Sequence, residues 1–301
     1  MARRVSEPQP SGRSGRARPV ALAVIAIAVI AAGAWIAIRP SNDRSWVVEQ
    51  SRLAESRFDG DRLTIRNVRD FSWPAEGPPT ERWTERMYDL SGIETVWFVL
   101  TPFATDWRGP AHAFLSFGFA DSQYVAISVE ARREAGETYS IAKGLLKRFE
   151  IAYIIGDERD LIGSRALRQR DDVYVYPIRA TPEAVRQLFE DMLRSANRLA
   201  ERPEFYGSLR NNCTTRILRH VNAIIDEPIR WQWRVLLPGY SDELAFERGL
   251  LDTTLPLDSA RLRYLVNDRV HAHIDAPDFS TRIREAGDEQ RGRIDTMGDR
   301  L

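Results

Sequence analysis

The amino-acid sequence predicts an α+β domain, in which an antiparallel sheet packs on helices, preceded by one transmembrane helix. Segments typical of strands come first along the chain and helical segments follow, whereas a doubly wound sheet would alternate the two. A stretch of uncharged residues, 19–38, lies near the N-terminus. The 301 residues, 43% of them hydrophobic, are enough for one large folded domain beside this helix.

Residues 19–38 are long enough to cross a membrane, because a helix rises about 1.5 Å per residue and the hydrocarbon layer is roughly 30 Å thick. The segment before them carries five arginines against one glutamate. By the positive-inside rule, this places the N-terminus in the cytoplasm and the main domain outside. A cleaved signal peptide is the competing interpretation, but its apolar region usually has only about 7–15 residues. We therefore predict a signal anchor.

The chain is expected to divide into five parts: a disordered cytoplasmic tail at 1–18, the anchor at 19–38, a connector at 39–57, the main domain at 58–251 and a C-terminal extension at 252–301. From about residue 276 the extension is charged and weakly periodic, so we expect a solvated polar tail there.

The 43 basic and 43 acidic side chains cancel, so no net field attracts nucleic acid. We therefore expect no nucleic-acid partner.

Seven segments are predicted as strands from their β-branched and aromatic residues. They cover residues 62–68, 82–90, 94–100, 112–119, 124–130, 149–155 and 173–178. The fourth and fifth flank the turn residues 120–122 and alternate in polarity, which predicts a β-hairpin. In such a hairpin, Ser128 or Glu130 on the second strand comes near His112 on the first.

Two longer helices are predicted from capping residues and from apolar positions at helical spacing. Thr181 is suited to cap a helix and Pro182 to its first position, so one helix begins there and ends by Pro203. Another begins near Asn212, whose side chain is suited to cap it, which puts Cys213 in the first turn. Shorter helices are expected at 141–147 and 242–251.

Cys213 is the only cysteine, so its thiol is either buried and inert or kept for its reactivity. A helix N-terminus lowers the pKa of a thiol, and its backbone N–H groups can hold an oxyanion, which favours the reactive alternative. Against it, a lone cysteine often serves as a small buried hydrophobe. These patterns alone support an enzyme and a non-enzyme about equally.

Covalent catalysis by a thiol needs a base within hydrogen-bond reach, normally histidine. The chain has four histidines, His112, His220, His271 and His273. His220 lies ~10 Å from Cys213 along the same predicted helix, so we expect a structural or surface role for it. His112 is the better candidate for the base, and Ser128 or Glu130 would orient its imidazole. His271 and His273 could bind a metal ion together, but no third ligand lies at suitable spacing. We therefore expect no metal site and no cofactor.

Eight segments, taken in order, resemble the Lnb N-terminal periplasmic domain family. They are residues 64–71, 112–119, 128–132, 157–160, 173–176, 197–206, 211–215 and 237–242. The resemblance covers about 58–251 and implies a permuted papain-like, or NlpC-like, fold, in which the histidine strand precedes the cysteine helix. It also implies that His112 is the base and Cys213 the nucleophile.

Full-length proteins of this family are lipoprotein N-acyltransferases, which move an acyl chain to the α-amino group of a lipoprotein's N-terminal cysteine. The resemblance therefore implies a single-pass protein of the bacterial inner membrane, with a periplasmic domain and a membrane lipid or lipoprotein as substrate. Such enzymes carry further membrane segments after this domain, which a membrane partner protein could supply here.

Three functions stay open at this point. The first is acyl transfer or hydrolysis on lipids or lipoproteins through an acyl-thioester on Cys213. The second is a papain-like amidase or peptidase that acts on cell-envelope peptides, and the third is a non-catalytic domain that binds an envelope lipid or partner. For the enzyme, we expect substrate-binding or oxyanion roles for Asn211, Asn212, Tyr206, Arg132 and Asp160.

Overall fold

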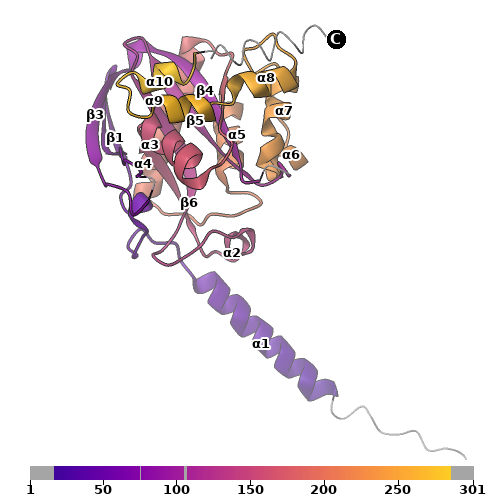
Figure 1. Cartoon of the computed structure of the whole chain (residues 1–301). Coiled ribbons are helices and arrows are strands. Elements are labelled where there is room, and N and C mark those ends of the chain that lie inside the picture. Colours follow the sequence, from indigo (N-terminus) through magenta and orange to yellow (C-terminus); the bar gives the residue numbers. More distant parts are fainter. Residues whose placement is uncertain (1–16, 75, 105–106, 286–301) are drawn as a thin grey trace, which may run out of the picture. The chain divides into compact units, whose positions relative to one another are not determined.

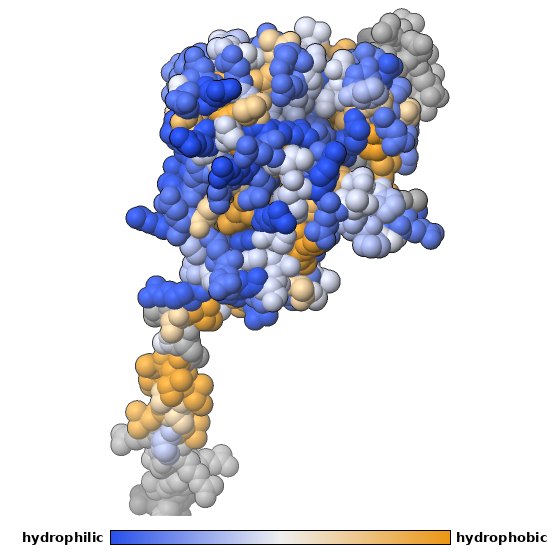
Figure 2. Space-filling model, turned by 90° about the vertical axis from the view of Figure 1, so that its left-hand side faces the viewer, coloured by the Kyte–Doolittle hydropathy of each residue, from blue (hydrophilic) through white to orange (hydrophobic). Residues whose placement is uncertain are grey.

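The computed structural model describes residues 17–74, 76–104 and 107–285, in two compact units, Met1–Pro40 and Ser41–Leu301. In the first unit, helix α1 spans Ala17–Ala37, which confirms the predicted helix. Its exposed side chains are apolar, as Figure 2 shows. Among the residues described, no helix is long and apolar enough to cross a membrane. Most of the predicted cytoplasmic tail lies outside the described residues.

The second unit is a mixed α+β domain built on one sheet (Figure 1). Its strands are β1 (Glu55–Asp59), β2 (Arg62–Arg69), β3 (Trp83–Asp89), β4 (Ile93–Pro102), β5 (Ala111–Phe119), β6 (Tyr124–Arg132), β7 (Glu150–Gly156) and β8 (Tyr174–Pro177). The order across the sheet is β1-β2-β7-β6-β5-β4-β8, with β3 also on β2. All pairs are antiparallel except β2 with β7. The predicted antiparallel sheet is thus confirmed, whereas β1, which begins inside the predicted connector, was not predicted.

The predicted hairpin is confirmed as β5 and β6, in which Phe114 faces Ser128 across the two strands. The helices are α2 (Ile141–Leu145), α3 (Glu158–Gly163), α4 (Pro182–Glu201), α5 (Cys213–Asn222), α6 (Trp233–Leu236), α7 (Ser241–Glu247), α8 (Leu257–Tyr264), α9 (Asn267–His273) and α10 (Phe279–Arg282). Short single turns lie at Val48–Gln50, Leu90–Gly92 and Pro238–Tyr240, and a π-helix at Ser164–Gln169. Thr181 caps α4 as predicted, because its hydroxyl accepts from the N–H of Ala184 at 3.3 Å.

Helices cover both faces of the sheet, so every residue of β5 is buried. On one face, α4 and α5 pack against β5 residues such as Leu115 and Phe117 in the main core. On the other face, α3, α9 and α10 pack against Phe114 in a second core (Figure 1). The strand that carries His112 is therefore rigidly enclosed, and a polar side chain on it needs a partner within the protein.

The C-terminal extension forms part of the second core. Its buried apolar residues are Val266, Val270, Phe279 and Ile283. Arg284 adds an ion pair with the fully buried Glu158, with 2.8 Å between Nη1 and Oε2. The prediction of a solvated tail from residue 276 is therefore wrong for 276–285, because these short helices bury an apolar side chain at each turn. Residues 286–301 lie outside the described part of the chain.

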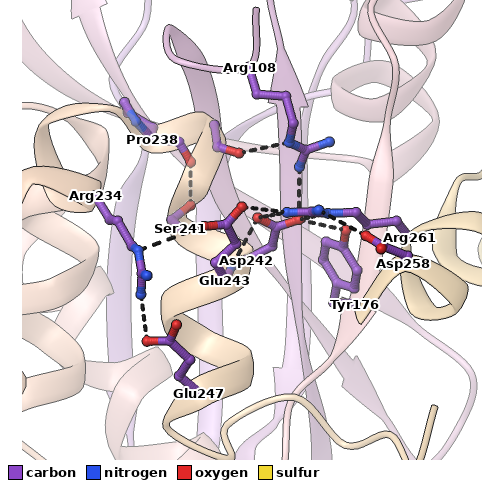
Figure 3. A network of polar contacts seen from close by, with 11 residues as sticks. Arg108, Tyr176, Arg234, Pro238, Ser241, Asp242, Glu243, Glu247, Asp258 and Arg261 are labelled. Atoms are coloured by element: carbon purple, nitrogen blue, oxygen red, sulfur yellow. Dashed lines mark hydrogen bonds and ion pairs between the residues drawn. The ribbon is translucent and has the colours of Figure 1, made fainter. Parts of the chain in front are cut away.

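The carboxylate of Asp242, at the start of α7, holds three segments together (Figure 3). It is fully buried and accepts hydrogen bonds from Arg108 at 2.8 Å, from Arg261 at 2.9 Å and from the Tyr176 hydroxyl at 3.1 Å. These partners come from the loop before β5, from α8 and from β8. Removal of one partner of such a buried pair typically costs about 3–5 kcal/mol. The network therefore fixes the loop that leads into β5.

Gly239 brings the chain before α7 into direct contact with the same loop. Its N–H donates to the carbonyl of Gly109 at 3.1 Å, and its own carbonyl accepts from Arg108 Nε at 3.2 Å. A β-carbon at this position would overlap the carbonyl group of Arg108. Only glycine therefore allows the two backbones to approach this closely.

We expect Gly239→Ala to lower the free energy of unfolding by roughly 1–3 kcal/mol, because the methyl group forces the two backbones apart. Denaturant titration of the full chain measures this loss. Gly92→Ala is the matched control, since a β-carbon there meets no atom of the described residues within 4 Å. Equal stability of the two variants would contradict the close contact.

Candidate thiol site

Cys213 is the first residue of α5, as predicted, and Asn212 caps this helix. The side-chain oxygen of Asn212 accepts from the N–H of Thr215 at 2.9 Å, and the Thr215 hydroxyl accepts from the N–H of Asn212 at 2.9 Å. This reciprocal capping box defines where the helix begins. The thiol therefore lies in the first turn, where backbone N–H groups have no partner within the helix.

The Cys213 thiol is buried, with 5% of the residue exposed. Backbone groups of Ala113, on β5, and of Thr214 hydrogen-bond the sulfur. Burial raises the pKa of the thiol, and these hydrogen bonds and the charge of Arg165 offset only part of that rise. The sequence predicted a pKa lowered by the helix N-terminus. The direction is the opposite, because burial raises the pKa more than the hydrogen bonds and Arg165 lower it.

His112, Ser128 and Glu130 form a hydrogen-bonded chain across the β5–β6 hairpin. The Ser128 hydroxyl donates to Glu130 Oε1 at 3.0 Å, so its oxygen accepts from the protonated Nε2 of His112 at 2.7 Å. His112 Nε2 is 4.0 Å from Glu130 Oε1, so the hydroxyl connects the two. The sequence left open whether Ser128 or Glu130 orients the imidazole, and the structure brings both to it in series. The other ring nitrogen, Nδ1, is left to act as an acceptor.

Gln50, from the connector, completes this chain. Its side-chain N–H donates to Glu130 Oε2 at 2.6 Å, and its side-chain oxygen accepts from the N–H of Arg133 at 2.8 Å. Burial alone would raise the pKa of Glu130, but the electrostatic interactions with His112, Arg69 and Arg165 and the hydrogen bond from Gln50 lower it to about 2. Burial and, to a smaller extent, Arg165 lower the pKa of His112 to about 3. At neutral pH the carboxylate is therefore ionised and the imidazole is neutral.

Cys213 and His112 line the same cavity, which has a volume of about 360 Å³. Its wall also carries aromatic side chains, Phe103, Tyr139 and Tyr206, and polar ones, Gln50, Glu130, Arg133, Arg165 and Gln169. A second cavity of about 250 Å³ shares His112 and all five of these polar residues, and Ser128 lines it as well. The imidazole thus lies between a partly aromatic cavity that contains the thiol and a more polar one.

Tyr206 is a predicted site residue that lines the thiol cavity. Its hydroxyl lies 3.2 Å from the hydroxyl of Tyr139, and burial raises its pKa, so it stays a neutral hydrogen-bonding group. Asn211 and Asn212 have structural roles instead. Asn211 donates to the carbonyl of Phe205 at 2.7 Å, and Asn212 caps α5 and donates to the carbonyl of Ser208 at 2.7 Å. Neither amide is among the residues that line the two cavities.

Arg132 and Asp160 also lie outside the walls of these two cavities. Arg132 holds the connector, since it donates to the carbonyls of Gln50 at 2.9 Å and Ser51 at 3.0 Å. Asp160 is fully buried and accepts from Arg69 Nε at 2.8 Å, from the N–H of Phe71 and from the Trp73 indole. In this structure both side chains make structural contacts, Arg132 with the connector and Asp160 with Arg69, Phe71 and Trp73.

Sequence reasoning missed several residues of the cavity wall: Gln50, Phe103, Arg133, Tyr139, Arg165 and Gln169. Most come from loops, from a single turn or from the π-helix at Ser164–Gln169, where no periodic pattern exists to place a side chain. An arginine or glutamine in such a segment resembles any solvated polar residue in sequence.

The other histidines lie away from the thiol. His220 is buried, with Nε2 at 2.5 Å from the Tyr153 hydroxyl and Nδ1 at 2.6 Å from Asp191, which agrees with the structural role considered for it. His271 and His273 lie on helix α9 and not on a strand. Among the described residues, no group of three or more His, Cys, Asp or Glu side chains could hold a metal ion.

We expect alkylation of Cys213 by iodoacetamide to be slow at pH 7 and to accelerate only at a higher pH than in the unfolded chain, because burial raises the pKa of the thiol. The rate measured by mass spectrometry from pH 5 to 10 tests this, with the urea-unfolded chain as the control for intrinsic reactivity. A fast plateau near pH 6 that disappears in His112→Ala would contradict a neutral pair and indicate a thiolate–imidazolium pair.

Comparison with known proteins assigns the domain. Residues 79–239 match the Lnb N-terminal periplasmic domain, and the match contains Cys213, His112, Ser128 and Glu130. Neither the curated proteins nor the solved structures include a match. The family match covers more than half of the chain and confirms the resemblance found in the sequence. The chain therefore belongs to the Lnb N-terminal periplasmic domain family, a family of extracytoplasmic domains by its description.

Proposed function

We propose that the chain is a cysteine-dependent enzyme that transfers or hydrolyses acyl groups of membrane lipids or lipoproteins through an acyl-thioester on Cys213. One observation carries the proposal: the thiol at the start of α5 lines the same cavity as His112, and Ser128 and Glu130 orient that imidazole. A nucleophile, a base and a group that orients the base are the parts that acyl transfer needs.

His112 acts as the general base in this proposal. Its Nδ1 takes the proton of the Cys213 thiol while the sulfur attacks the ester carbonyl carbon, and the C=O electron pair moves to oxygen. When the tetrahedral intermediate collapses, the C–O bond to the alcohol breaks and the imidazolium returns the proton to that alcohol. An amine or water then attacks the thioester with help from the same imidazole and releases Cys213.

Two further parts of the site stabilise the charges that form during this reaction, one on the oxyanion and one on the imidazolium. Backbone N–H groups in the first turn of α5 stabilise the oxyanion, while the side chains of Asn211 and Asn212 are engaged in structure. The carboxylate of Glu130, reached through Ser128, stabilises the imidazolium that forms when His112 accepts the proton. Since the resting pair is neutral, proton transfer accompanies attack and no thiolate is stored.

The order of the elements supports the interpretation of the fold as permuted papain-like. The strand that carries His112, β5, precedes the helix that carries Cys213, α5, in the chain. In this interpretation the sheet presents the base and the helix presents the nucleophile at one cavity.

Incubation of the full chain with phospholipid vesicles is expected to add the mass of one acyl group to Cys213, detected by intact-protein mass spectrometry. Cys213→Ser should abolish the thioester adduct, and His112→Ala should slow its formation by roughly 10²–10⁴-fold, because general-base catalysis contributes about that much. His271→Ala is the matched control, since that imidazole is exposed on α9.

Ser128→Ala tests how the His112 imidazole is oriented, separately from its role as a base. The variant keeps the imidazole but disconnects it from Glu130, so the adduct should form at least about tenfold more slowly. An adduct that forms equally fast in His112→Ala and His271→Ala would contradict the proposed base. No adduct with any lipid class would favour the amidase or the non-catalytic binding domain.

A papain-like amidase that acts on cell-envelope peptides is the second candidate. The arginines beside the imidazole favour it, because Arg133 and Arg165 line both cavities and suit a substrate that carries carboxylates. The aromatic wall formed by Phe103, Tyr139 and Tyr206 favours the acyl substrate. Release of peptides from a defined peptidoglycan fragment distinguishes this candidate from the first.

We further propose that residues 19–38 anchor the chain in the bacterial inner membrane, with the N-terminus in the cytoplasm. The uncharged stretch and the arginines before it support this proposal. A phosphatase reporter that is active only in the periplasm, fused after residue 285, is expected to be active and to fractionate with membranes. Recovery of the chain in the soluble periplasmic fraction with a new N-terminus would show a cleaved signal peptide instead.

A further inference from the structure

Five large apolar side chains are exposed around α2 and the loop before Cys213. They are Tyr139, Ile141, Leu145, Leu146 and Leu209, which we name the α2 rim, and between 41% and 55% of each residue is exposed. Globular proteins expose single apolar residues often, but a contiguous group of this kind marks an interaction surface.

The members of the α2 rim belong to one surface because α2 packs on the loop that precedes Cys213. The Ser208 hydroxyl donates to the carbonyl of Ile141 at 2.8 Å, which places Leu209 beside the start of α2. A β-carbon at Gly144 would meet Ser208 and Tyr206, so the inner side of the helix lies against this loop. The outer side therefore carries the exposed leucines.

Basic side chains are interspersed among these apolar ones. Lys143 and Lys147 lie within or just after α2, Arg148 follows, and Arg210 is the neighbour of Leu209. Lys147 lies over the Phe205 ring, and Arg148 pairs with Glu137 at 3.1 Å. Lys143, Lys147, Arg148 and Arg210 therefore supply four basic side chains among the exposed apolar ones. Apolar side chains mixed with lysine and arginine are typical of segments that lie in the interface of an anionic bilayer.

The α2 rim also borders the thiol cavity, because Tyr139 belongs to both. Its ring stacks on Phe149 with 5.9 Å between centroids, and its hydroxyl meets that of Tyr206, another residue of the cavity wall. A molecule that leaves a lipid surface at the α2 rim is thus next to the cavity that contains Cys213.

The first residue of the second unit, Ser41, lies at the same edge of the domain. The N–H of Ser41 donates to Glu150 at 3.1 Å. Glu150 follows Arg148 by two residues and pairs with Phe205, over which Lys147 lies. A membrane attachment before Ser41 would therefore enter the domain beside the α2 rim.

We propose that the α2 rim inserts into the headgroup region of an anionic phospholipid bilayer and holds the mouth of the thiol cavity against the lipid surface. The inference goes beyond the proposed function, since it concerns a binding surface and needs no reaction at Cys213. The leucines supply buried apolar area, and the lysines and arginines supply attraction to anionic headgroups.

The experiment uses the full chain with Cys213→Ser as background and one new cysteine for an environment-sensitive fluorophore. Leu146→Cys reports on the α2 rim, and Met87→Cys and Trp233→Cys report on exposed apolar residues elsewhere. Each labelled chain is mixed with vesicles of phosphatidylglycerol and phosphatidylcholine that contain brominated lipid, or with phosphatidylcholine vesicles alone. We expect a blue shift and at least about twofold stronger quenching at position 146 than at the other two with anionic vesicles.

Charge reversal tests the basic part of the surface. Lys143→Glu together with Arg148→Glu should remove most of the quenching at position 146 with anionic vesicles, while circular dichroism shows an intact fold. Quenching at position 146 no stronger than at 87, or strongest at 233, would overturn the inference, and so would equal quenching with both vesicle types. Because the background lacks the thiol, failure here is distinct from failure to form the acyl adduct.

Discussion

Burial of β5 on both faces is the constraint on which the rest of the domain depends. All nine of its residues are buried, yet two of them, His112 and Ser116, are polar. An unpaired polar group in such a place costs roughly 1–3 kcal/mol, so each needs a partner from a neighbouring element. Ser116 donates to Glu158, which Arg284 of the C-terminal extension also binds. His112 hydrogen-bonds Ser128, and two polar positions on the same side of one strand thus order both the extension and the candidate base.

The same burial sets the charges of the site. It keeps the His112 imidazole neutral and the Cys213 thiol protonated, whereas neighbouring cations keep Glu130 ionised. The negative charge therefore lies at the far end of the hydrogen-bonded chain, one hydroxyl away from the imidazole. In the proposed reaction, the Glu130 carboxylate would stabilise the positive charge that forms on His112 when it accepts the thiol proton. Burial disfavours a stored thiolate–imidazolium pair, because it raises the pKa of the thiol and lowers that of the imidazole.

Local patterns explain which parts of the structure could be predicted from sequence. The caps at Thr181 and Asn212 and the hairpin around residues 120–122 involve neighbours in the chain, so their geometry follows from short segments. Arg132 shows where this reasoning stops. By strand alternation it shares a side of β6 with Glu130, and both contact Gln50, but the connector's carbonyls bind Arg132 and keep it from the cavity.

The remaining residues of the site depend on contacts between distant segments. Arg165 reaches the cavity from a π-helix that follows α3, and Gln50 reaches it from a single turn about 80 residues before Glu130. Neither position has a periodic signal. The C-terminal extension was likewise underestimated, because its apolar residues are spaced too sparsely to indicate an amphipathic helix, although each fills a place in the second core.

The distribution of polarity in the thiol cavity bears on the class of substrate. Arg133 and Arg165 lie where the cavity adjoins its more polar neighbour, and Tyr139 lies where it borders the exposed leucines of the α2 rim. A molecule with a charged head and an apolar chain matches this gradient along its length. In the proposed function, its ester linkage would lie beside Cys213 and His112, which line the same cavity. A peptide, polar along its whole backbone, matches only the arginine side, and for this reason we propose an amphiphilic substrate rather than a peptide.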